Sequence, residues 1–109
     1  MHDERYQEKD TAVATWLARQ GWPVTDRHRD PSSEVRAWRS EAVRPTITLR
    51  ITRNVVDDYT ADELVRHLDR FRAAQVLSRA PEKYTVLRTS DAGPPELVQL
   101  DAPPKASAH

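Results

Sequence analysis

The chain has 109 residues, the length of one domain, and its 17 basic side chains balance 17 acidic ones. This balance excludes a strongly basic packager of nucleic acid, but not a local basic patch. The absence of cysteine excludes disulfide bonds, thiolate zinc sites and cysteine nucleophiles. The first residues lack the basic and apolar segments of a signal peptide, and no apolar run reaches the about 20 residues that span a bilayer. We therefore expect a cytoplasmic protein.

A helix is predicted for residues 3–20. Val13, Trp16 and Leu17 share one face at helical spacing, and Gly21 follows at the position where a glycine commonly ends a helix. The apolar side of this helix is expected to pack on the rest of the domain.

The segment 24–43 has two interpretations. In the first it is a hairpin, with strands at 24–29 and 34–40 and a type I turn at 30–33 that begins with Asp-Pro. In the second it contains a helix over 31–42, with the same proline in the first turn. We favour the hairpin, because the strand that follows needs partners and a two-stranded sheet is only marginally stable.

Residues 46–53 alternate between apolar and polar side chains, which predicts a strand with one buried face. The apolar face holds Ile47, Leu49 and Ile51, and the polar face holds Thr46, Thr48, Arg50 and Thr52. Its polar face is the first place to look for a binding surface.

One long helix is predicted to follow this strand. Thr60 and Glu63 have the spacing of a capping box, in which each side chain bonds the backbone N–H of the other residue. Pro81 is expected to end the helix. The predicted apolar stripe consists of Leu64, Val65, Leu68 and Phe71, and continues through Gln75 and Val76.

A further strand is predicted at 84–89. If it pairs beside 46–53, the segment 46–89 becomes a right-handed crossover through the long helix. Residues 96–100 could add an edge strand or stay extended. We expect a single domain over 1–90 and a flexible, proline-rich tail over 91–109. The fold class is α+β, with an N-terminal helix, a small and mainly antiparallel sheet of three to four strands, one long helix packed on it and a C-terminal strand.

Catalytic and metal-binding patterns are sparse. Asp26, His28 and Asp30 would share one face of a strand and could ligate a metal, but we favour solvated or ion-paired side chains, because no second cluster of ligands accompanies them. The acidic side chains between 57 and 63 match the positive end of a helix dipole. His67 has no visible partner for general base catalysis, and two glycines cannot form a phosphate loop. We therefore predict no enzyme, metal or cofactor, and keep a metal-dependent hydrolase as the last alternative.

A nucleic-acid interpretation has more support. Residues 26–53 hold seven arginines against four acidic residues, and a tryptophan between two of the arginines could form a stacking platform. The candidate partner- or nucleic-acid-binding residues are Arg36, Trp38, Arg39, Thr48, Arg50 and Arg53. A strand that leads into a helix also resembles the ribbon-helix-helix repressors, in which two helices follow the strand. Residues 53–59 are too short for a convincing first helix of that kind.

The main expectation is a small non-enzymatic protein-interaction or regulatory module, with a protein partner or a second copy of the chain in a homodimer. Nucleic-acid binding through the Arg- and Thr-lined sheet face is the alternative. The exposure of the polar face of strand 46–53 distinguishes these two hypotheses. A face that is covered at Thr48, Arg50 and Thr52 has an interface or folding role, whereas an open face beside Arg36 and Arg39 favours nucleic acid.

Overall fold

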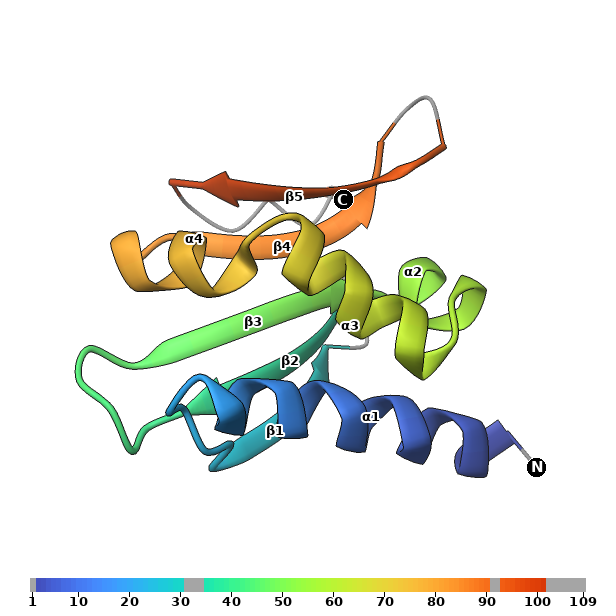
Figure 1. The fold of residues 1–109 in the computed structure, drawn as a ribbon, viewed down its shortest axis with the longest axis horizontal. Helices are drawn as coiled ribbons and strands as arrows, with labels where there is room; N and C mark the ends of the chain where they lie inside the picture. The colour runs from blue at the N-terminus through green and yellow to red at the C-terminus, as the bar shows by residue number, and fades with distance from the viewer. Residues whose placement is uncertain (1, 31–34, 91–92, 102–109) are drawn as a thin grey trace.

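The computed structural model describes residues 2–30, 35–90 and 93–101, and in this part of the chain helices cover one face of a five-stranded sheet (Figure 1). The elements are α1 (His2–Arg19), β1 (Asp26–Asp30), β2 (Val35–Ser40), β3 (Ile47–Thr52), α2 (Arg53–Asp58), α3 (Ala61–Arg70), α4 (Ala73–Arg79), β4 (Tyr84–Thr89) and β5 (Pro95–Leu100). Helices α1, α3 and α4 lie over the sheet, and α2 lies at one end of it. The predicted α+β class and the N-terminal helix are confirmed.

The strands follow chain order in the sheet, β1-β2-β3-β4-β5. Neighbours are antiparallel except β3 and β4, which are parallel and are joined by the crossover through α2, α3 and α4. The sheet is therefore mainly antiparallel, as predicted, with five strands rather than three to four. Strand β5 shows that 96–100 adds an edge strand, so the sheet extends to Leu100. Of the predicted tail over 91–109, residues 91–92 and 102–109 lie outside the described residues.

Strands β1 and β2 form the predicted hairpin, in a register that runs from Asp26 opposite Arg39 to Asp30 opposite Val35. The alternative helix over 31–42 is wrong, because β2 spans 35–40 and pairs with strands on both sides. Residues 31–34, which include most of the predicted turn, lie outside the described part. Pairing with β3 therefore decides the structure of 35–40, although the apolar residues of 31–42 also have helical spacing.

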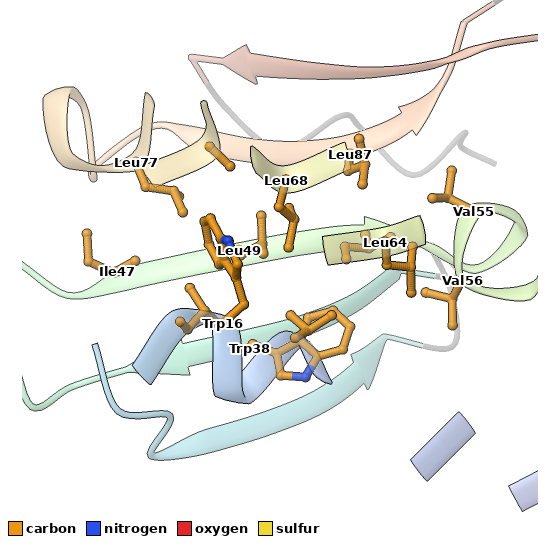
Figure 2. Close-up of a cluster of buried hydrophobic side chains, with 14 residues drawn as sticks. Trp16, Trp38, Ile47, Leu49, Val55, Val56, Leu64, Leu68, Leu77 and Leu87 are labelled. Atoms are coloured by element: carbon orange, nitrogen blue, oxygen red, sulfur yellow. The ribbon is translucent and has the colours of Figure 1, made fainter. Parts of the chain in front are cut away.

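The core lies between the helices and the covered face of the sheet (Figure 2). Each layer contributes large side chains that are 3% exposed or less. They are Trp16 and Leu17 from α1, Trp38 from β2, Leu49 and Ile51 from β3, Leu64 and Leu68 from α3, Leu77 from α4 and Leu87 from β4. This packing fixes which side of each strand faces the helices.

Helix α1 is held on the core by polar as well as apolar contacts. The Lys9 Nζ donates to the carbonyl oxygen of Val56 at 2.6 Å, and the indole N–H of Trp16 donates to Asp69 Oδ1 at 2.8 Å. The helix ends at Arg19, and Gly21 follows it with a φ of 92°, the left-handed conformation for which a glycine was predicted at this end. These contacts tie α1 to both α2 and α3.

The predicted long helix is two helices, and this prediction is corrected. The break falls at Arg72, whose φ of 55° is left-handed, between α3 and α4. A continuous helix would turn Ala73 away from the core, because it comes about two and a half turns after Leu64. The break rotates α4 so that Ala73 and Leu77 are buried, while Gln75 is exposed. The capping box at the start of α3 is confirmed.

A short helix, α2, forms where the sequence suggested only a connection. Its six residues bury Val55 and Val56, two adjacent apolar side chains that one helical turn can direct at the core. The similarity to ribbon-helix-helix repressors does not extend further, since β3 lies inside the sheet between β2 and β4.

Candidate functional site: the open face of the sheet

The two faces of the sheet differ in what lies on them. Trp38 on β2 and Leu49 on β3 are register partners and face the helices. The next residues along the same strands, Arg39 and Thr48, are also partners and lie on the opposite side. We call this side the open face, because α1, α3 and α4 all lie over the other one (Figure 1). Its arginine and tyrosine side chains are half-buried, and the smaller Ala37 and Val86 beside Arg50 are buried.

Arg50 lies at the centre of the open face. The register places it between Ala37 on β2 and Val86 on β4, so its methylene stem can cover both. Its guanidinium carbon lies 4.1 Å from the centre of the Tyr84 ring, a cation–π contact. Burial lowers the pKa of Arg50, and repulsion from Arg39 acts in the same direction. Among the described residues, no carboxylate pairs with Arg50.

A polar cavity of about 360 Å³ lies at one end of this face. It is bounded by side chains from β2, β3 and the start of β4, and by the residue after β5. The lining residues are Arg39, Thr46, Thr48, Arg50, Pro81, Glu82, Lys83, Tyr84 and Asp101. The cavity therefore combines three cationic groups, two carboxylates and several hydroxyls.

Two of the three cations at the cavity have carboxylate partners. Lys83 Nζ lies 2.5 Å from Asp101 Oδ1, and this contact raises the pKa of Lys83 and lowers that of Asp101. Arg39 lies 3.3 Å from Glu41 through one terminal nitrogen, whereas its Nε is buried and has no hydrogen-bond partner in the described structure. The donors left over are the Arg39 Nε and the guanidinium of Arg50.

Three of the six candidate residues from the sequence meet at this cavity, namely Arg39, Thr48 and Arg50. The other three lie elsewhere. Arg36 faces the helices, with its guanidinium 3.5 Å from the ring centre of Tyr6. Arg53 begins α2 and lies 3.5 Å from the carboxylate of Asp57.

Trp38 does not form a stacking platform. Its side chain is 1% exposed, and its indole N–H donates to Asp10 Oδ1 at 2.5 Å. The prediction assumed an exposed ring because arginines flank it in the sequence. In a strand, however, residues 36 and 38 share a face, and here that face is the covered one.

Sequence reasoning missed the contribution of β4 to the site. Lys83 and Tyr84 follow the crossover, more than 30 residues after Arg50, and Asp101 comes still later. The sequence left the pairing of 84–89 beside 46–53 as a possibility, and this pairing, which the structure contains in parallel orientation, is the signal that could have brought Tyr84 next to Arg50. The required register, with Arg50 opposite Val86, is set by core packing and not by local sequence.

The described residues contain no group of three His, Asp or Glu side chains placed to hold a metal ion. The backbone of β1 places Asp26 and His28 opposite Arg39 and Ala37, but the side chains of His28 and Asp30 lie outside the description. Glu63 accepts a hydrogen bond from the Thr60 N–H at 2.9 Å, which lowers the pKa of this carboxylate. Its role is therefore to cap α3.

His67 lies on α3 between two aromatic rings. Its ring meets Tyr59 edge-on, with centroids 4.6 Å apart, and stacks on Phe71 at 6.2 Å. The Nε2 atom is buried without a hydrogen-bond partner among the described residues. Neither of the two cavities found in the described residues is lined by His67.

Comparison with known proteins finds no matching family, no matching curated protein and no matching solved structure. Of the helices in the described residues, none has both the length and the apolar character needed to cross a bilayer. The case for a function therefore depends on the geometry of the open face.

Proposed function

We propose that this chain is a small non-enzymatic binding module that holds a protein partner on the open face of its sheet. The observation that supports the proposal most directly is Arg50, a half-buried cation with no carboxylate partner in the described structure. A half-buried charge without a carboxylate partner adds little to stability, so the guanidinium of Arg50 on a central strand is available for a role outside folding. Arginine and tyrosine are also enriched at the energetic centres of protein interfaces.

Nucleic-acid binding is the second candidate, and one observation favours it. Arg50 and Arg39 lie close enough for their charges to interact, beside the ring of Tyr84, and guanidinium and aromatic groups are the usual contacts for phosphates and bases. Most other cations of this face are already paired, however. Lys83 pairs with Asp101, and Arg88 donates to Glu96 at 3.2 Å. A face neutralised in this way provides little general attraction for a polyanion.

The proposal is tested by crosslinking the tagged, full-length protein in the cells that make it. Wild type is compared with Arg50→Glu and with Arg66→Glu, the same charge change at an exposed position of α3. We expect specific proteins, or a second copy of the chain, to crosslink to wild type and Arg66→Glu but not to Arg50→Glu. Equal crosslinking by Arg50→Glu would contradict the open face as the partner site.

The two candidates are separated by fluorescence anisotropy. Mixed-sequence duplex and single-stranded DNA are titrated with the protein at low and then physiological salt. Micromolar binding that weakens steeply with salt, and is lost in Arg50→Gln, would favour nucleic acid over a protein partner. The protein-partner proposal expects no binding even at low salt.

A further inference from the structure

The cavity at the end of the open face has an excess of hydrogen-bond donors. Arg39 on β2 is the register partner of Thr48 on β3, and Arg50 lies two residues further along β3 on the same face. Two guanidinium groups thus flank one hydroxyl. The Arg39 Nε has no acceptor, and the described structure pairs Arg50 with an aromatic ring rather than with a carboxylate. Buried donors without acceptors are rare in folded proteins and call for an explanation.

We infer that this cavity binds a carboxylate, carried by an acidic side chain of the partner, between the guanidinium groups of Arg39 and Arg50. The inference rests on the proposed function and specifies the chemistry that the partner must present. A carboxylate has two acceptor oxygens in one plane, and guanidinium groups bind such an acceptor through parallel N–H donors. It would supply an acceptor for the Arg39 Nε and for the Arg50 guanidinium, neither of which has one among the described residues, and would relieve the repulsion between the two side chains.

The charges around the cavity favour a carboxylate over a phosphate. Because Lys83 pairs with Asp101 and Arg39 with Glu41, Arg50 is the one cation lining the cavity that no described carboxylate neutralises. A monoanion matches this single charge. A phosphate group with two charges would also lie beside the carboxylate of Glu82, with no second unpaired cation to compensate it.

Tyr84 gives the site its orientation. The ring lies against the Arg50 guanidinium, at 4.1 Å, and so restricts the plane in which the N–H donors point. The volume of about 360 Å³ exceeds that of a carboxylate alone. It is at the lower end of the range for ligand pockets, which suits an acidic side chain inserted from a protein surface.

The test is an NMR titration of the full-length, ¹⁵N-labelled protein that follows the arginine side-chain Nε–Hε signals. The probes are acetate, a short blocked peptide with one glutamate, and the same peptide with glutamine instead. We expect acetate and the glutamate peptide to shift the Arg39 and Arg50 signals saturably. Arg88 is the internal control, because it lies on the same face but already donates to Glu96. Its signal should not move, and sodium chloride should reproduce none of the saturable shifts.

Matched variants locate the site. Arg50→Gln should weaken binding of the glutamate peptide by about tenfold or more, the effect of one charge-assisted hydrogen bond. Arg88→Gln removes a cation from the same face and should leave binding unchanged. Tyr84→Phe keeps the aromatic ring and should also bind. A denaturation curve for each variant shows that the fold is intact.

Three outcomes would overturn the inference. They are the absence of saturable shifts with the glutamate peptide, equal shifts with the glutamine peptide, and saturation by inorganic phosphate but not by acetate. The crosslinking experiment keeps this failure separate from that of the proposed function. A partner that is lost in Arg50→Glu although the cavity binds no carboxylate would refute the inference alone. Carboxylate binding without any partner would refute the proposed function and leave the binding site in place.

Discussion

The two faces of the sheet are built from the same strands but differ in the burial and the chemistry of their side chains. On β3, Leu49 points into the core and is completely buried, whereas its neighbour Thr48 is half-buried on the open face. The covered face holds apolar side chains that the helices enclose. The open face holds guanidinium groups and hydroxyls with spare donors. The first face explains why the chain folds, and the second carries groups for which folding gives no reason.

The largest expected effect would test this division directly. Leu49→Ala should lower the free energy of unfolding by about 2–5 kcal/mol, because it leaves a cavity in the core. Thr48→Ala, one residue away, should change it by less than about 0.5 kcal/mol, the usual range for a surface substitution. Urea denaturation followed by circular dichroism measures both. Similar losses for the two variants would mean that the open face also contributes to the core.

A smaller effect is expected at the polar contacts that hold α1 on the covered face. Asp10 accepts from the indole N–H of Trp38 and also lies 2.9 Å from Arg27. Asp10→Ala leaves the buried indole N–H unpaired and should lower the free energy of unfolding by about 1–3 kcal/mol. Asp10→Asn keeps an acceptor oxygen and should lose less. An equal loss for both variants would assign the effect to the ion pair with Arg27 instead.

The covered face is also the part of the fold that could be predicted from the sequence. Strict alternation over 46–53 identifies β3, and the capping box at Thr60 and Glu63 identifies the start of α3, since both signals are local. The break between α3 and α4 could not be read in the same way. Leu68 and Phe71 continue a regular helical stripe, so only the need to bury Leu77 on the same core reveals the turn at Arg72.

The helix break at Arg72 predicts the sign of the change in the free energy of unfolding when this residue is replaced by glycine. Arg72 has a φ of 55°, a left-handed conformation that costs a side chain with a Cβ roughly 1–2 kcal/mol. Arg72→Gly removes this strain but adds freedom to the unfolded chain, so the free energy of unfolding should stay level or rise by up to about 1 kcal/mol. In a continuous helix the same glycine would lower it by about 1 kcal/mol. Thermal denaturation distinguishes the two cases, and Arg66→Gly, at an exposed position inside α3, is the control that should destabilise.

The candidate site on the open face could be predicted only in part, because it combines residues from three strands. Alternation shows that Thr48 and Arg50 share the polar face of their strand, and this was found from the sequence alone. For β2 the alternation is poor, because Ala37 and Trp38 are both apolar, so the side on which Arg36 and Arg39 fall could not be assigned. The contribution of Tyr84 depends on a register fixed by packing across the parallel pair. A local sequence pattern does not predict contacts between segments that are distant in the chain.

The smallest expected effect on stability lies at the centre of the open face. Arg50→Met keeps most of the stem that can cover Ala37 and Val86 but removes the charge. The loss of the contact with Tyr84 and the relief of a half-buried, unpaired cation oppose each other, so the free energy of unfolding should change by less than about 1 kcal/mol. Binding of the glutamate peptide should nevertheless be lost. A large destabilisation would mean that Arg50 serves the fold, and the contrast between the two faces would then be wrong at its central residue.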